Sequence, residues 1–426
     1  MGILLQEQNR YIRDVLAVIN GLTIYDGISE DRFVRGLRDL LVSLLRADES
    51  DADYPTVSLL DNMDAYCDLW RILFEETGTA VPDLSEYLIA RMKGSDNAFS
   101  RRAASAKGPI AMSDDPSFFG IVLGDLDRLK VLSSLPARMI TALFSPLTSG
   151  SLPEWSHRVN ADNPSVLMTN LWDFHRRQGF GPFAVCDTFL WKGNALIPVY
   201  DPDPILPEQL FCYDFEIDQV RSNTIRLLDR RRADNLLLFG ARGTGKSSAV
   251  KAVANEYRRR GLRLIEIDKD DLLTIHGLLS LLAGHASSNL SFILFLDDLS
   301  FPEDDPRCTV LKTLLEGTAK SRPENVAIYA TSNRRHIVAE KDGNDRYESD
   351  AKEEKLSLSD RFGISIRFSS PTQGTYLSIV RGILSSRGMQ FNPDQLDAEA
   401  LAWAMRENGR SPRTARQFAD YYESTF

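Results

Sequence analysis

Apolar residues recur at helical spacing through the first 180 residues. They form stripes over residues 11–19, 33–44 and 60–73, in which apolar positions lie three or four residues apart. This period gives each helix one apolar face, and several such helices bury those faces against one another. We therefore predict a mainly α-helical N-terminal domain over residues 1–180.

The pattern changes after residue 180. Two apolar runs, residues 183–191 and 195–200, flank Lys192-Gly193-Asn194, which is typical of a β-hairpin with a glycine-containing turn. The segment Asp201-Pro202-Asp203-Pro204 then stiffens the chain, because proline restricts the backbone of the residue before it. We predict that residues 181–204 form a hairpin and a linker, so that the helical domain ends in this hairpin.

Short apolar runs alternate with helical stretches in the second half of the chain. The runs cover residues 235–239, 263–267, 292–296, 326–330 and 364–368. Apolar strands that alternate with helices are typical of an α/β domain whose parallel sheet is covered on both faces. Residues 341–355 are mostly charged and polar, which predicts a mobile surface insertion.

Length and charge narrow the class of protein. The chain has 426 residues, enough for two or three domains, and its apolar fraction of 43% is ordinary for a globular protein. A net charge of −10 disfavours non-specific binding to nucleic acid or to an anionic membrane.

The four cysteines show no C-x-x-C spacing, so no zinc site or redox pair is predicted. No apolar run approaches the ~18–20 residues that cross a bilayer, and no signal segment is evident at the start. We expect a cytoplasmic protein without a membrane partner.

A phosphate-binding motif lies between the strand at residues 235–239 and the next helix. The sequence Gly-Ala-Arg-Gly-Thr-Gly-Lys-Ser over residues 240–247 fits G-x-x-x-x-G-K-[ST]. Its glycines allow backbone N–H groups to surround a phosphate, Lys246 reaches the β- and γ-phosphates, and Ser247 ligates Mg²⁺. The candidate nucleotide-binding residues are Gly240, Ala241, Arg242, Gly243, Thr244, Gly245, Lys246, Ser247 and Ser248.

Two acidic residues follow the strand at residues 292–296. Asp297 and Asp298 stand at the carboxyl end of this strand, where open α/β sheets bind their ligands. We assign Asp297, together with Ser247, to a Mg²⁺ site, and Asp298 to orienting or deprotonating the attacking water. Alone, two acids after a strand are a weak signal, but here they follow a phosphate-binding motif in the same sheet.

Three further residues extend the predicted site. Asn333 follows the strand at residues 326–330, where it would position the lytic water. Arg361 stands just before the strand at residues 364–368. Arg413 lies in the first turn of a helix that Ser411 caps, from which it would reach the nucleotide. Each has a simple structural alternative, and only their order after the phosphate-binding motif favours the functional interpretation.

The order of these motifs resembles the AAA+ ATPase family. The resemblance identifies residues 240–247 as Walker A, residues 292–298 as Walker B, Asn333 as sensor 1, Arg361 as an arginine finger and Arg413 as sensor 2. It implies a P-loop NTPase domain over residues 205–370, a helical lid over residues 371–426, and ATP and Mg²⁺ as cofactors. It also implies a homo-oligomer in which Arg361 serves a neighbouring subunit's site.

The resemblance is closer to an uncharacterised family of predicted bacterial AAA+ ATP-binding proteins. It rests on the sequences at residues 297–301, 329–336, 354–363 and 413–418, and it covers residues 205–426. This family supplies no cellular role.

One residue departs from the AAA+ pattern and keeps two functions open. The second Walker B acid is usually glutamate, whereas Asp298 is one methylene shorter. The leading interpretation is a Mg²⁺-dependent ATPase that remodels or regulates a partner bound by the N-terminal domain, with hydrolysis that depends on assembly. The alternative is an ATP-binding switch or scaffold with little hydrolysis.

Two features of the sequence bear on what the expected ATPase would act on: a missing aromatic residue and a cluster of arginines. No Phe, Tyr or Trp lies between Leu264 and Ser291, where protein-threading relatives carry an exposed aromatic residue, so threading of a polypeptide is disfavoured. The basic cluster Arg258-Arg259-Arg260 with Arg263 leaves a nucleic-acid loader possible, but a helix end also accounts for it. The sequence does not identify the protein partner.

Overall fold

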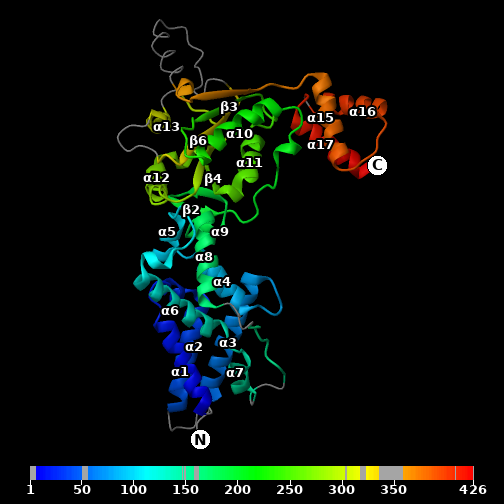
Figure 1. Cartoon of the computed structure of the whole chain (residues 1–426). Coiled ribbons are helices and arrows are strands. Elements are labelled where there is room, and N and C mark those ends of the chain that lie inside the picture. Colours follow the sequence, from blue (N-terminus) through cyan, green and yellow to red (C-terminus); the bar gives the residue numbers. More distant parts are fainter. Residues whose placement is uncertain are drawn as a thin grey trace. The chain divides into compact units, whose positions relative to one another are not determined.

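The computed structural model (Figure 1) divides into two compact units, Met1–Val185 and Cys186–Phe426. It describes residues 6–49, 56–145, 147, 150–157, 163–302, 305–316, 323–334, 358–407 and 409–425. The insertion predicted at residues 341–355 lies outside these residues. Within the described ranges, no helix combines the length and the apolar character that a bilayer crossing requires.

The first unit is built from helices, as the apolar stripes predict. Its longer helices are α1 (Gln6–Asn20), α2 (Arg32–Glu49), α3 (Thr56–Thr77), α4 (Leu84–Gly94), α6 (Pro116–Ser133) and α8 (Pro164–Gln178). Its shorter elements are η1 (Asp26–Glu30), α5 (Ala98–Ala104), η2 (Met112–Asp114), α7 (Arg138–Thr141), η3 (Ala142–Phe144) and α9 (Pro182–Val185). Two helices begin in the same way, with a capping side chain followed by proline: Asp115 before Pro116, and Asn163 before Pro164.

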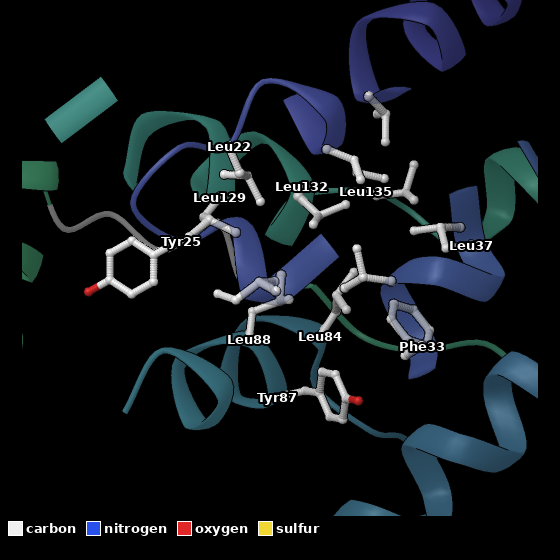
Figure 2. Packing of buried hydrophobic residues seen from close by; sticks show 14 of the residues in the cluster. Leu22, Tyr25, Phe33, Leu37, Leu84, Tyr87, Leu88, Leu129, Leu132 and Leu135 are labelled. Atoms are coloured by element: carbon white, nitrogen blue, oxygen red, sulfur yellow. The ribbon is translucent and has the colours of Figure 1, made fainter. Parts of the chain in front are cut away.

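The stripes of these helices meet in one apolar core. Figure 2 shows Phe33 on α2, Leu84 and Leu88 on α4, and Leu129 and Leu132 on α6 pointing toward one another. All five side chains are buried, and burial of a residue this large contributes about 1.5–3 kcal/mol. The hydrophobic effect thus accounts for the assembly of this unit.

One buried carboxylate in the first unit holds a loop in place. Asp125 on α6 accepts hydrogen bonds from the backbone N–H groups of Thr23, Ile24 and Tyr25 at 2.9, 2.7 and 3.0 Å. The Thr23 hydroxyl donates a further bond at 3.1 Å, and Arg128 forms an ion pair with the same carboxylate at 3.2 Å. Asp125 therefore fixes the chain where it leaves α1.

The described residues of the second unit form a seven-stranded sheet in the order β2-β1-β4-β5-β6-β3-β7. The strands are β1 (Thr188–Lys192), β2 (Ala195–Pro198), β3 (Leu236–Gly240), β4 (Leu262–Ile267), β5 (Ser291–Leu296), β6 (Val326–Ser332) and β7 (Ile364–Phe368). Among these described strands, β1 and β2 pair in antiparallel and the other neighbours pair in parallel. Every residue of β5 and β6 is buried, which requires helices on both faces.

Helices cover this sheet and continue into a group at the end of the chain. The helices between strands are α10 (Asp214–Leu228), α11 (Lys246–Tyr257), α12 (Ile275–Ala283) and α13 (Pro306–Glu316), with the short turns η4 (Pro207–Gln209), η5 (Arg258–Arg260) and η6 (Lys269–Thr274). The final group comprises α15 (Gln373–Ser386), α16 (Pro393–Arg406) and α17 (Pro412–Thr425), drawn in orange to red in Figure 1. The P-loop sheet followed by a helical lid is confirmed.

The structure differs from the sequence pattern at the hairpin. The pattern attaches the hairpin to the helical half, whereas β1 pairs with β4 in parallel over Thr188–Trp191, which makes the hairpin an edge of the second unit's sheet. The run at residues 183–191 is also not all strand. Gly181 and Pro182 start a helical turn, α9, because proline suits the first position of a helix. The domain boundaries given above stay predictions.

Candidate functional site

The phosphate-binding motif connects β3 to α11. All three of its glycines have backbone angles that other residues rarely adopt: φ is +145° at Gly240, +77° at Gly243 and +92° at Gly245. A methyl group on Gly240 would lie 2.0 Å from the carbonyl oxygen of Phe368 on β7. Glycine at position 240 therefore lets the loop leave the sheet directly against the neighbouring strand, and Gly245 starts the helix.

Lys246 points back into the loop that precedes it. Its Nζ donates to the carbonyl oxygens of Gly240 and Ala241, both at 2.8 Å, and to Oδ1 of Asn333 at 3.3 Å. Burial lowers the pKa of Lys246 below its ordinary value of 10.5, although the carboxylates of Asp297 and Asp298 act in the opposite direction. Such a buried ammonium gains from an additional anionic partner, and a polyphosphate supplies one.

Ser247 and Asp297, the two predicted metal ligands, are in direct contact. The Ser247 hydroxyl donates to Oδ1 of Asp297 at 2.6 Å. Both are oxygen ligands, which Mg²⁺ prefers, and a nucleotide-bound Mg²⁺ takes its other ligands from phosphates and water. The described residues contain no group of three or more His, Cys, Asp or Glu suited to a metal. The residues fit Mg²⁺ in this way.

Asp298 has an unusual backbone and contacts the predicted sensor residue. Its φ is +49°, a conformation that costs a non-glycine residue of order 1 kcal/mol or more. The side-chain amide of Asn333 donates to Oδ1 of Asp298, while the amide oxygen of Asn333 accepts from Lys246. Asn333 therefore links Lys246 to the second acid.

A cavity of about 680 Å³ brings most of the predicted site residues together. Eleven of them line it: Arg242, Gly243, Thr244, Gly245, Lys246, Ser247, Ser248, Asp297, Asp298, Asn333 and Arg413. Gly240 and Ala241 are not among the described residues that line it. The backbone N–H of Arg413 donates to the carbonyl oxygen of Gly243 at 3.3 Å, which joins α17 to the loop. The cavity carries four cations, Arg242, Lys246, Arg413 and Arg416, against two carboxylates. Its charge is thus opposite in sign to the net charge of the chain.

The cavity also has an apolar wall that the sequence pattern did not predict. The wall consists of Leu210, Phe211, Tyr213, Phe368, Ile379 and Ile383, from the segment before α10, from β7 and from α15. Phe211 packs against α15, where a methyl group on Gly382 would lie 2.7 Å from its ring. These residues lie far apart in the sequence and form no motif, so no sequence signal identifies them as one wall. A flat purine base suits such a surface of aromatic and aliphatic groups.

Arg361 lies away from the other predicted site residues. Ile364 at the start of β7 pairs with Leu236 at the start of β3, whereas the phosphate-binding loop follows the end of β3. Strand residues rise about 3.3 Å each, so the two ends of β3 are separated by roughly 15 Å. Arg361 forms an ion pair with Glu316 and is absent from the described residues that line the cavity.

Comparisons with known proteins place the second unit in a family. Residues 184–426 match the family model described as "Protein of unknown function (DUF815)". No curated protein matches the chain. The matched residues are more than half of the chain and contain the whole cavity.

Solved structures similar to this chain include two kinds of protein. A variant of RuvB from Thermotoga maritima has 14% identity and a TM-score of 0.34; the match covers 51% of this chain and 63% of RuvB. The ORC1 protein of Aeropyrum pernix, in complex with DNA, has 17% identity and a TM-score of 0.37, over 52% of this chain and 62% of ORC1. This chain thus spans less than two thirds of either protein.

These TM-scores are too low to assign a fold to this chain. The fold assignment therefore rests on the geometry of the chain itself and on the family match. The parallel sheet, the glycine-rich loop after β3 and the helical lid supply that geometry. The chain therefore belongs to the DUF815 family, and its second unit has the P-loop fold with a helical lid that the AAA+ resemblance implies.

Proposed function

We propose that the second unit binds ATP with Mg²⁺ and hydrolyses it. The observation that carries this proposal is the convergence of Lys246, the Ser247–Asp297 pair and Asp298 on one cavity with an apolar wall. The polar end fits a triphosphate and the apolar wall fits the base. An open parallel sheet binds ligands at this edge, outside the carboxyl ends of its strands.

The chain's own residues divide the chemistry between them. Backbone N–H groups of the loop and Lys246 bind the phosphates, and Arg413 approaches from α17. Ser247 and Asp297 hold the metal ion, which when bound neutralises charge that develops on the phosphates. Asp298 accepts a proton from, or orients, the attacking water, and Asn333 holds the side chain of Asp298 in position.

Arg361 acts on the site of a neighbouring copy in this proposal. Because it lies at the opposite end of β3 and β7 from the phosphate-binding loop, it does not reach the nucleotide of its own subunit. A homo-oligomer brings it to the next subunit, where an arginine contributes about 10³–10⁵ in rate in related phosphoryl-transfer systems. The pair with Glu316 then has to open on assembly.

The first unit binds a protein partner in this proposal, and ATP turnover remodels or regulates that partner. Threading of a polypeptide is less favoured because the segment after β4 is tied down. The Asp271 carboxylate accepts from the backbone N–H of Gly193 at 2.9 Å, and Thr274 accepts from the Trp191 ring N–H at 2.9 Å. Asp270 also forms an ion pair with Arg307.

Binding to nucleic acid is also less favoured. Arg263 is buried at 1% exposure, and burial lowers its pKa to about 10. Arg260 forms an ion pair with Asp229 at 3.2 Å, and Arg258 lies 3.9 Å from Asp187. Three of the four arginines of the cluster, Arg258, Arg260 and Arg263, are thus accounted for by burial or by acidic neighbours within the second unit.

Steady-state phosphate release tests hydrolysis against the alternative of an ATP-binding switch. Wild type, Lys246→Ala and Arg361→Ala are compared over a range of protein concentrations, with Mg²⁺ present. We expect turnover per subunit to rise with concentration in wild type only. Wild type that binds ATP and assembles, yet releases no more phosphate than Lys246→Ala, would leave the switch as the function. Equal turnover per subunit at high dilution and in the assembled state would contradict action of Arg361 on a neighbour.

A further inference from the structure

The hydroxyl group of Thr331 connects the two acidic residues at the edge of the sheet. Thr331 is the last residue but one of β6, and its side chain is 2% exposed. Its hydroxyl donates to Oδ1 of Asp297 at 2.5 Å, and its oxygen accepts from the backbone N–H of Asp298 at 2.9 Å. One small group thus contacts the side chain of one acid and the backbone of the other.

Thr331 also holds the strained turn that follows β5. The backbone N–H of Leu299 donates to the carbonyl oxygen of Thr331 at 2.8 Å, next to the bond from Asp298. The φ of +49° at Asp298 is unfavourable by itself, so surrounding contacts must maintain it. Two consecutive hydrogen bonds to Thr331 are such contacts, and they set the direction in which the Asp298 side chain leaves the backbone.

The hydrogen bonds at Asp297 indicate which donor stays when a metal ion is bound. Oδ1 accepts from the Ser247 hydroxyl at 2.6 Å, from Thr331 at 2.5 Å and from the Asp298 N–H at 3.1 Å. A carboxylate oxygen has two lone pairs, so three donors compete for it. Ser247 is the donor with an alternative role as a metal ligand. Thr331 lines the cavity but is buried and fixed by its second hydrogen bond.

We propose that Thr331 is a positioning residue for the hydrolysis proposed above. Its hydroxyl keeps Asp297 in the orientation that receives Mg²⁺ and keeps the backbone of Asp298 in the conformation that presents its carboxylate to the attacking water. The inference rests on the proposed function and adds a residue to which neither the phosphate-binding motif nor the acid pair assigns a role. Partners behind a metal ligand contribute about 10–100-fold in metal affinity or activity in other proteins.

Three variants separate positioning from a merely structural role. Thr331→Val keeps the shape and removes the hydroxyl, whereas Thr331→Ser keeps the hydroxyl. Ser332→Ala is the matched control, because Ser332 is equally buried and donates to the carbonyl oxygen of Leu299 at 2.9 Å, away from both carboxylates. Thermal unfolding is followed for each variant, and Thr331→Ala replaces Thr331→Val if the latter does not fold.

The readouts are the Mg²⁺ concentration for half-maximal phosphate release, kcat, and the KM for ATP. For Thr331→Val we expect the Mg²⁺ concentration for half-maximal phosphate release to rise about tenfold and kcat to fall about tenfold, with little change in the KM for ATP. Thr331→Ser and Ser332→Ala should stay within about threefold of wild type on every measure. Wild-type Mg²⁺ dependence and kcat in Thr331→Val, or equal losses in Thr331→Ser, would overturn the inference.

A titration of ATP with and without Mg²⁺ distinguishes failure of this inference from failure of the proposed function. If wild type releases no more phosphate than Lys246→Ala, the proposed hydrolysis is wrong. The affinity for ATP with and without Mg²⁺ then tests the role of Thr331 by itself. Wild type should bind ATP more tightly when Mg²⁺ is present, and Thr331→Val should lose most of that gain. No gain in wild type, or an equal gain in both proteins, would overturn the role of Thr331.

Discussion

Asp125 in the first unit and Asp297 in the second are both carboxylates surrounded by donors, yet the donors differ in kind. Three backbone N–H groups and a hydroxyl bind Asp125, which is fully buried. Asp297 accepts from the hydroxyls of Ser247 and Thr331 and from one backbone N–H, and it lines the cavity.

This difference separates a structural carboxylate from one that can bind a metal ion. Backbone N–H groups follow the path of the chain, so Asp125 is committed to the loop over residues 23–25. A hydroxyl group rotates at small cost, so Ser247 can turn from Asp297 to a metal ion and leave an oxygen of Asp297 available. The presence of a buried acid is thus less informative about function than the kind of donor that it binds.

The largest expected effect is on the first unit. Asp125→Ala leaves three backbone N–H groups and Arg128 without this partner, so we expect a loss of about 3–5 kcal/mol in the free energy of unfolding. Chemical denaturation measures the loss, and hydrogen exchange should show faster exchange in α1 and α6. Asp127→Ala, at an exposed position on the same helix, is the control. An equal loss in Asp127→Ala, or unchanged stability in Asp125→Ala, would contradict the structural role.

Lys246→Ala should affect binding and spare the fold. We expect ATP affinity to fall about 100-fold, which corresponds to about 2.7 kcal/mol, because the ammonium is the buried cation nearest the expected phosphates. Lys251→Ala is the control, since Lys251 lies on the same helix and pairs with Glu266 at 2.8 Å. Calorimetric titration measures both variants. Retained affinity in Lys246→Ala would place the nucleotide elsewhere.

Asp297→Asn tests the comparison directly. The amide oxygen still accepts from Ser247 and Thr331, so the free energy of unfolding should change by only about 1 kcal/mol. The charge that attracts Mg²⁺ is lost, and the gain in ATP affinity from Mg²⁺ should fall about tenfold. Titrations with and without Mg²⁺, together with denaturation, check both parts. A loss of stability as large as that of Asp125→Ala would make Asp297 a structural residue of the same kind.

The smallest effect concerns pH. Burial lowers the pKa of Lys246 in the folded protein below 10.5, so the side chain loses its charge at a lower pH than in the unfolded chain. The stability cost of this buried charge is therefore present at neutral pH and disappears as the pH rises above the folded-state pKa. ATP affinity should weaken over the same window, by about twofold where the pH equals that pKa. Affinity that stays constant up to pH 10.5 would contradict this.

The sequence predicts much of the second unit because its signals are local. The predicted strand at residues 292–296 and the observed β5 differ by one residue. The predicted strands at residues 263–267 and 326–330 likewise differ from β4 and β6 by one and two residues. The glycine-rich loop, Asp297 and Asp298 are contiguous motifs whose chemistry follows from residue type. The positions of Asn333 and Arg413 after this loop, supported by the family resemblance, predicted both residues, and both line the cavity.

Contacts between distant segments account for what the sequence did not predict. The wall formed by Phe211 and Ile383 depends on α15 packing against a segment about 170 residues earlier, which no periodicity encodes. The role of Asp125 depends on a loop 100 residues away. Thr331 belongs to an apolar strand, and its two hydrogen bonds become visible only when β5 and β6 lie side by side.

Hydrogen exchange of wild type with and without Mg²⁺–ATP tests the central claim, that the cavity of the second unit is the nucleotide site. We predict slower exchange in three segments that contribute to the cavity, residues 209–213, 242–248 and 412–416. This protection by Mg²⁺–ATP should be lost in Lys246→Ala. Protection that falls outside these segments, or that is the same in wild type and Lys246→Ala, would contradict it.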